Sequence, residues 1–137
     1  MSDHYLLDTN LLSESRRKQP NAGVTAFLNQ TDPSLHRISV LTLGELRKGV
    51  AIKRNSDRKA AQQIESWIDG LELSFAGQIL GIDTPTARLW GEWSAQRPRA
   101  VVDTLLAATA RVNDLVLVTR NTADVGDLPI RVLNPWD

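Results

Sequence analysis

The chain has no cysteine, only two histidines and a single methionine among its 137 residues. Without cysteine it can form neither disulfides nor thiolate sites, which excludes zinc ribbons and thiol nucleophiles. It lacks any apolar run near the roughly 18 residues that a membrane-spanning helix needs, and its N-terminal residues show no signal-peptide pattern. We therefore expect a cytoplasmic protein that makes no membrane contact.

A net charge is also missing, because sixteen lysines and arginines balance sixteen aspartates and glutamates. Nucleic-acid-binding proteins usually have a basic surplus, so the total weighs against this function. The distribution differs from the total: residues 47–59 contain six cations and one acid, and residues 16–18 form a second basic cluster. The acids that balance these segments lie elsewhere, and their positions are informative.

Aromatic residues are scarce, at 5%, and four of them are tryptophans. Three of these tryptophans lie in segments with helical spacing, at Trp67, Trp90 and Trp93. We interpret them as packing residues, with a stacking platform for nucleic-acid bases as the alternative.

What the chain does contain is enough apolar content, 42%, for one domain of residues 1–137. Short apolar segments predict strands at residues 5–8, 37–40, 79–82, 115–119 and 130–133. Helical patterns lie between them, at residues 9–18, 20–30, 41–53, from 57 into the mid-70s, from 84 onward and at 101–112. This alternation predicts a mostly parallel sheet with helices on both faces, a three-layer α/β/α sandwich.

Acidic residues far apart in the sequence are predicted to meet at one edge of this sheet. Asp8 ends the first strand, and Asp124 lies in the loop after the strand at residues 115–119. Glu45 and Asp103 lie in the first turns of helices. Crossover helices begin at the edge where parallel strands end, which is also where such sheets bind ligands.

Asp8, Glu45 and Asp124 each have an ordinary explanation as a helix cap, a solvated helix residue or a turn residue. Asp103 is harder to explain, because its helix, AVVDTLLAATA, is apolar nearly all round. A carboxylate there costs several kcal/mol unless a cation lies nearby. Carboxylates without histidine or cysteine suit Mg²⁺ or Mn²⁺, and such ions promote phosphodiester hydrolysis. The four acids therefore predict a metal-dependent phosphodiesterase site.

The basic stretch supplies a hypothesis for how a polyanionic substrate is held. Within residues 47–59 we expect contacts with RNA phosphates from Arg47, Lys48, Lys53 and Arg54. The alternatives are a solvated helix end or ion pairs across a dimer interface. His4 and His36 are expected to lie away from the acidic edge, because each lies near the start of a predicted strand.

Four segments carry a resemblance to a known family: LLDTNLLSE, SVLTLGELRKGV, VVDTLLAATA and LVLVTRNTADV. They look like the acidic motifs of the PIN-domain ribonucleases, most closely the VapC-type toxins of bacterial toxin–antitoxin pairs, over essentially the whole chain. The resemblance implies Mg²⁺ or Mn²⁺ bound by Asp8, Glu45, Asp103 and Asp124, and cleavage of single-stranded RNA. It implies that Asn10 and Thr119 position metal, water or phosphate. It also implies an α/β/α fold, a homodimer, and inhibition by a small antitoxin.

The chain departs from the family pattern at two points. Val125 follows the last acid, where the family often has an aromatic residue, and QRPRAVVD leads into the third motif, where the family has a shorter or glycine-containing approach. A catalytically inactive PIN-like binding module remains an alternative, although such a module is expected to lose at least one acid. A Mg²⁺-binding receiver domain is a further alternative, but it needs an acid pair after the first strand and a lysine near the last strand.

Overall fold

The predicted apolar segments form the strands of one parallel sheet in the computed structural model, which describes residues 2–136. The first and last residues of the predicted 1–137 domain lie outside this range. The strands follow the order β3-β2-β1-β4-β5, and every neighbouring pair is parallel. Their bounds are β1 Tyr5–Leu7, β2 His36–Ser39, β3 Ile79–Leu80, β4 Val116–Val118 and β5 Val132–Leu133. The predicted α/β class is confirmed, with a wholly parallel sheet.

The helices connect these strands, and two short ones were not predicted. Their bounds are α1 Thr9–Ser15, α2 Ala22–Gln30, the 3-10 helix η1 Pro33–Leu35, α3 Val40–Arg54, α4 Arg58–Ser74, α5 Thr84–Gln96, α6 Val101–Val112 and α7 Thr122–Val125. The predicted start of a helix at Pro20 is wrong, because the Asn21 side chain caps α2 by accepting from the Gly23 and Val24 N–H groups. The predicted helix from residue 84 onward is confirmed, and its cap is Asp83, whose side chain accepts the Thr86 N–H.

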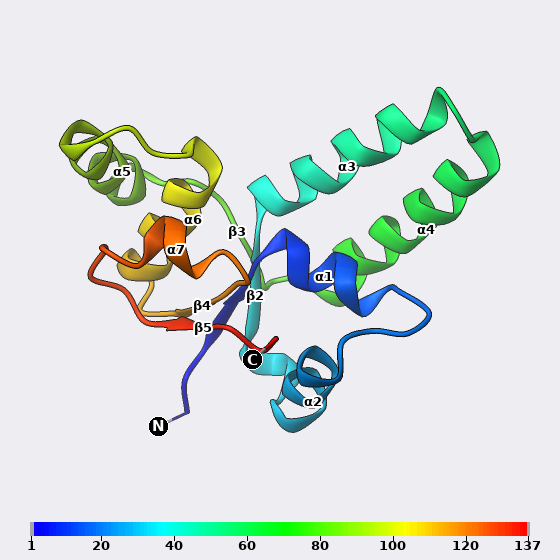
Figure 1. The fold of residues 1–137 in the computed structure, drawn as a ribbon, viewed down its shortest axis with the longest axis horizontal. Helices are drawn as coiled ribbons and strands as arrows, with labels where there is room; N and C mark the ends of the chain where they lie inside the picture. Colours follow the sequence, from blue (N-terminus) through cyan, green and yellow to red (C-terminus); the bar gives the residue numbers. More distant parts are fainter. Residues whose placement is uncertain (1, 137) are drawn as a thin grey trace.

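Helices cover both faces of the sheet (Figure 1). Successive side chains of a strand point to opposite faces, so Leu6 and Leu7 enter different hydrophobic clusters. Leu7 packs with buried residues of α1 to α4, and Leu6 packs with buried residues of α5, α6 and α7. Strand β4 is apolar at every position because it lies between β1 and β5 and helices cover both of its faces.

The tryptophans are packing residues, and His36 lies away from the acidic edge, as predicted. Trp93 is buried, and Trp67 and Trp90 pack against the two clusters. His36 is buried at the amino end of β2, where it stacks on Phe27. Within residues 2–136 no helix is long and apolar enough to cross a membrane.

Two helical hairpins enclose the edge where the strands end. The α3–α4 pair extends away from the sheet on one side, and the packed pair α5–α6 lies on the other (Figure 1). The residues that follow β1 and β4, and the first turns of α3 and α6, therefore face a shared space between the hairpins.

Candidate active site

Asp8 is the most buried acid at this edge. It directly follows β1 and is only 4% exposed. Its Oδ1 accepts the Thr9 N–H at 2.7 Å, and its Oδ2 accepts the Thr119 hydroxyl at 2.7 Å. Burial raises the pKa of Asp8, while the hydrogen bonds from Thr119 and Thr9 act in the opposite direction. Since Thr119 directly follows β4, the Asp8–Thr119 bond joins the ends of the two central strands.

Glu45 joins the site through a threonine that the sequence did not single out. The Thr9 hydroxyl donates to Glu45 Oε1 at 2.6 Å and lies 3.2 Å from the Thr42 hydroxyl. Thr9 thus contacts Asp8 through its backbone and Glu45 through its side chain. A sequence signal existed for both threonines, because Thr9 follows Asp8 and Thr42 precedes Glu45 by one helical turn.

Asp103 lies in the first turn of α6, as predicted, and shares a small cavity with Asp8. Thr119 and Asn121 line the same cavity. Burial is the largest cause that raises the pKa of Asp103 to about 6, and the charges of Asp8, Asp124 and Glu45 contribute to the same shift. The four predicted acids are therefore close enough to act on one another electrostatically.

Asp124 lies in the short helix α7 rather than in a loop, so this detail of the prediction is wrong. Asp124 is exposed, and its charge and a side-chain hydrogen bond contribute to the raised pKa of Asp103. The loop expectation came from the polar sequence TRNTAD, which has no helical periodicity long enough to detect.

An arginine clamp, formed by Arg97, Arg99 and Asp127, holds α7 against the approach to α6. The Arg99 side chain is 2% exposed and binds both Asp127 oxygens, at 3.1 and 2.8 Å. Its Nε donates to the Trp93 carbonyl at 2.9 Å, and Arg97 binds Asp127 at 3.0 Å. Asp127 is three residues from Asp124, and Arg99 is four residues from Asp103. The clamp therefore links the segment before the third motif to the turn after the fourth.

The acids of the site form no ion pair within the part of the chain that the structure describes. The ion pairs of residues 2–136 involve other carboxylates, and none involves Asp8, Glu45, Asp103 or Asp124. Over the same residues, no three His, Asp or Glu side chains gather closely enough to hold a metal ion as they stand. The donor set nevertheless consists of carboxylate and hydroxyl oxygens, which fits a hard divalent cation, and such an ion would supply the missing positive charge.

Asn10 lies beside the acids rather than among them. It lines a neighbouring pocket together with Arg120 and Asn121, and Asn121 also lines the acid cavity. The Asn121 N–H donates to the Thr119 hydroxyl at 3.1 Å, which ties this loop to Asp8 through Thr119. The two predicted polar residues therefore occupy different positions: Thr119 donates a hydrogen bond to Asp8, and Asn10 lines the neighbouring pocket.

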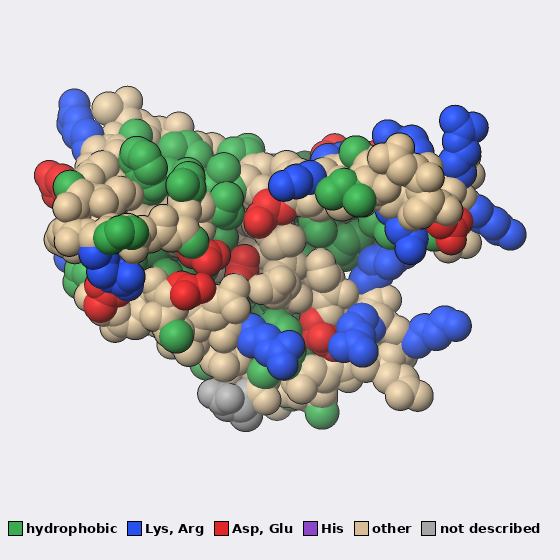
Figure 2. Space-filling view, turned by 45° about the horizontal axis from the view of Figure 1, so that its top comes forward, with side chains coloured by type: hydrophobic (Ala, Val, Ile, Leu, Met, Phe, Trp, Pro, Cys, Tyr) green, Lys and Arg blue, Asp and Glu red, His purple; other side chains and the backbone are tan. Residues whose placement is uncertain are grey.

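Two of the four predicted phosphate-binding cations already have carboxylate partners. Arg47 binds Asp69 at 2.8 Å and Glu72 at 2.9 Å, both on α4, and these hydrogen bonds raise its pKa. Arg54 lies 3.5 Å from Glu65. In contrast, Lys48 is exposed, and Lys53 lines a groove that also contains Thr9 and Glu45. Figure 2 shows acidic side chains in the hollow centre of this face and basic ones gathered to its right.

Known proteins resemble this chain over nearly its whole length. Toxin FitB of Neisseria gonorrhoeae is 36% identical over 138 residues, which cover 96% of this chain and 97% of FitB. The VapC ribonuclease Y4jK of Sinorhizobium fredii is 28% identical and covers 96% of this chain and 97% of its own.

Solved structures share the fold. The crystal structure of FitAcB from N. gonorrhoeae has a TM-score of 0.86 at 33% identity, covering 96% of this chain and 98% of the other. A toxin–antitoxin complex from Klebsiella pneumoniae has a TM-score of 0.66 at 25% identity, covering 97% and 98%. The model of the PIN domain matches residues 5–124, a range that contains all four acids. The chain belongs to the PIN-domain family.

Proposed function

We propose that this protein is a metal-dependent endoribonuclease and the toxin of a toxin–antitoxin pair. The observation that carries the proposal is the gathering of Asp8, Glu45, Asp103 and Asp124 around the carboxyl edge of the sheet, where none of them forms an ion pair with a cation of residues 2–136. Relatives named as a ribonuclease and a toxin support the same activity.

The four acids are the residues that would hold Mg²⁺ or Mn²⁺. A bound ion of this kind lowers the pKa of a water molecule and offsets negative charge on the scissile phosphate. Two hydroxyl groups prepare the acids for this role. Thr119 donates to Asp8, and Thr9 donates to Glu45, so the orientation of each carboxylate is restrained.

The remaining polar residues act on the substrate. Asn10 and Asn121 border the acid cavity from the adjoining pocket, and their amides can hydrogen-bond the sugar-phosphate chain beside the cleaved bond. Lys53, in the groove on the other side of Glu45, is the cation of residues 47–59 best placed to bind a neighbouring phosphate.

The proposed partner is a small antitoxin that carries a basic side chain into the acidic site. An unneutralised group of carboxylates attracts such a side chain, and the FitAcB and K. pneumoniae structures give precedents for complexes of related chains. A homodimer is also proposed, since Val40, Ile82 and Val101 expose apolar surface at the edge where the strands end. The cytoplasm, where RNA is available, is the proposed location.

RNA cleavage by the purified protein tests the proposal. We expect cleavage in the presence of Mg²⁺ or Mn²⁺, none in EDTA, and a loss of at least about 100-fold in the Asp8→Asn variant, which removes charge at nearly constant volume. Full cleavage by Asp8→Asn would contradict the assignment. Metal-independent RNA binding without cleavage by the wild type would favour the inactive binding module.

A further inference from the structure

A polar pocket of about 580 Å³ adjoins the acid cavity, between α1, the loop after β4 and the C-terminal residues. Its lining includes Asn10 and Ser13 from α1, Arg120 and Asn121 from the loop after β4, and Trp136 near the C-terminus. Asn121 lines both this pocket and the acid cavity, so the two spaces are neighbours. A strand of nucleic acid lying over Asp8 therefore reaches this pocket within a short distance.

Arg120 is the central cation of the pocket. It directly follows Thr119, whose hydroxyl binds Asp8, and it precedes Asn121, whose N–H binds Thr119. Its guanidinium lies 5.6 Å from the centre of the Trp136 ring. Within residues 2–136 it makes no ion pair. Arg120 is therefore anchored to the site, ordered by an aromatic ring, and available to an anion.

The one acid that lines the pocket, Glu14, already has hydrogen-bond partners within the protein. Glu14 is nearly buried and accepts the Asn21 N–H at 2.9 Å, and this bond lowers its pKa. Arg17, whose side chain is 69% exposed at the rim, lies 3.3 Å from the same carboxylate. The charge of Arg120 also acts on Glu14, but one carboxylate lies among two cations, so the pocket keeps a net positive charge beside the four carboxylates of the site.

The position of Trp136 depends on a glycine. Gly23, in the first turn of α2, packs directly against the Pro135 carbonyl oxygen, and any Cβ at this position would collide with it. The Trp136 N–H is also fixed, since it donates to Asn134 Oδ1 at 3.0 Å. The aromatic half of the Arg120–Trp136 stack is therefore held by the body of the protein.

We propose that this pocket binds the RNA nucleotide next to the scissile phosphate, with its base on the Arg120–Trp136 stack and its phosphate near Arg17. The inference rests on the proposed ribonuclease function and adds a substrate-binding site to it. Bases of single-stranded RNA stack on aromatic rings and on guanidinium planes, and arginine also binds phosphate. Because Trp136 already orders Arg120, binding loses less side-chain entropy than it would with a free arginine.

This location differs from the basic stretch on α3. A phosphate that binds Arg47 must compete with two carboxylates of α4, whereas one that binds Arg120 displaces no carboxylate of residues 2–136. The cations of the pocket can attract the substrate without blocking the acids, since they form no ion pair with the four acids of the site. Such an arrangement keeps the acids free while the adjacent backbone of the substrate is held.

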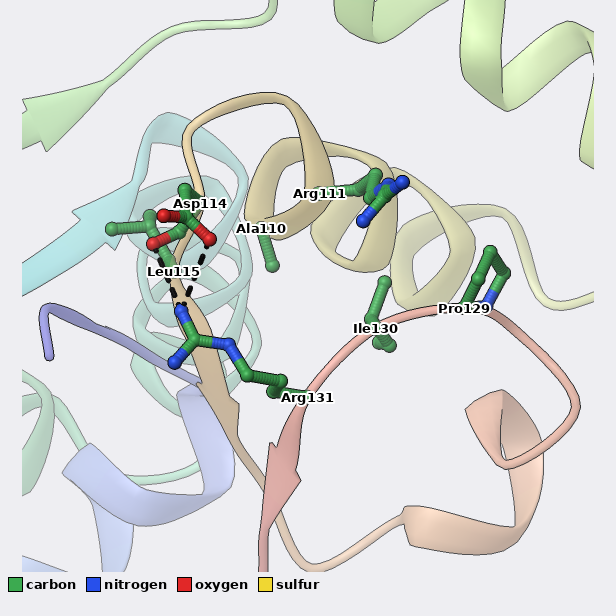
Figure 3. A pocket seen from close by; sticks show the side chains of 7 residues that line it. All are labelled: Ala110, Arg111, Asp114, Leu115, Pro129, Ile130 and Arg131. Carbon is green, nitrogen blue, oxygen red and sulfur yellow. Dashed lines mark hydrogen bonds and ion pairs between the residues drawn. The ribbon is translucent and has the colours of Figure 1, made fainter.

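Salt-dependent binding of a fluorescent single-stranded oligoribonucleotide to the Asp8→Asn protein tests the proposal. In this background Arg120→Gln should weaken binding about 10-fold at 0.1 M salt and reduce the slope of log K against log salt by about 0.7, the value for one phosphate contact. The matched control is Arg111→Gln, an equal charge change. Arg111 lines a pocket at the opposite edge of the sheet and points away from the Arg131–Asp114 pair (Figure 3). The control should keep its affinity within about 2-fold and its slope unchanged.

Trp136→Leu tests the stacking component. It should weaken binding roughly 5- to 100-fold without changing the salt slope, because stacking on an aromatic ring involves no phosphate charge. An oligonucleotide with an abasic site at the stacked position should bind the Trp136→Leu and parent proteins equally. Thermal melting shows whether Trp136→Leu still folds. If it does not, the Arg120→Gln variant still tests the proposal, because Arg120 is exposed.

Three results would overturn the proposal: an unchanged salt slope in Arg120→Gln, equal losses in Arg120→Gln and Arg111→Gln, or an Arg120→Gln variant that loses affinity for a purified protein partner but not for RNA. A failure of the ribonuclease function gives a different result. In that case the wild type leaves RNA uncut with Mg²⁺ and Mn²⁺, whatever the binding of the Asp8→Asn proteins.

Discussion

The carboxyl group of Asp103 illustrates how function opposes stability at a single residue. Its pKa rises from an ordinary 3.8 to about 6, because burial and three neighbouring acids disfavour its charged form. A carboxyl whose pKa is raised on folding stabilises the protein below pH 4, and this contribution is lost as the pH rises through 6. The metal-free protein therefore carries strain at neutral pH that a divalent cation would relieve.

Replacing Asp103 with asparagine should remove this strain. The pKa change corresponds to at most about 3 kcal/mol, and partial exposure of the side chain reduces the expected gain to about 1–2 kcal/mol. In EDTA at pH 7.5 the Asp103→Asn protein should melt about 2–5 °C above the wild type, and at pH 4 the difference should vanish. Thermal unfolding followed by circular dichroism at both pH values measures it. A variant that melts below the wild type at pH 7.5 would contradict the prediction.

The arginine clamp shows how one ion pair can place a short element. The helix α7 has four residues, too few for a helix to be stable alone, so its position depends on contacts around it. Arg99 provides these contacts through Asp127 and the Trp93 carbonyl. Because its side chain is almost completely buried, removing its carboxylate partner leaves a buried charge unpaired.

We predict that Asp127→Asn weakens the site through α7. It should lower the urea midpoint of unfolding and raise the metal concentration needed for half-maximal cleavage roughly 10-fold, since Asp124 is no longer held beside Asp103. Asp114→Asn removes a matched partner of Arg131 at an exposed position and should cost less than about 1 kcal/mol, with no change in metal dependence. Titrations of Mn²⁺ against initial cleavage rates, together with urea unfolding, distinguish the two variants. Equal metal dependence in both would show that the clamp only stabilises the fold.

Elements with a strong periodic pattern could be predicted from the sequence, and those that depend on tertiary contacts could not. The continuous apolar run before Thr119 and the apolar helix around Asp103 carry their own signal, which placed these segments correctly. In contrast, α7 and η1 are too short to show a period, and α2 begins where the Asn21 side chain caps it rather than at Pro20.

The same division applies to the site as a whole. Parallel topology alone brings Asp8, Glu45 and Asp103 to one edge, since each position is fixed by the end of a strand or the start of a helix. The partners of Arg47 and Arg99 lie 22 to 28 residues away in the sequence, across helix pairs and loops whose paths no local pattern specifies. The contact between Arg120 and the Trp136 ring also joins two residues outside helices and strands, so no local pattern could predict it.

The charge distribution of the whole molecule implies how its activity would be controlled. Four carboxylates that form no ion pair with a cation of residues 2–136 attract either a metal with RNA or the basic side chain of a protein partner, and both cannot occupy the site together. Expression of this chain alone should therefore arrest bacterial growth, and a small partner encoded beside it should relieve the arrest by occupying the acids.

Growth curves after induction of wild type and Asp8→Asn, each with and without the partner, measure this outcome. The wild type alone should stop growth, whereas Asp8→Asn should grow as the uninduced culture does, because it lacks cleavage but keeps the fold. The variant should also bind the partner roughly 10-fold more weakly, since one of the carboxylates that attract the basic side chain is gone. Equal arrest by both proteins would mean that growth stops for a reason other than RNA cleavage, and equal partner affinity would mean that inhibition does not act through the acids.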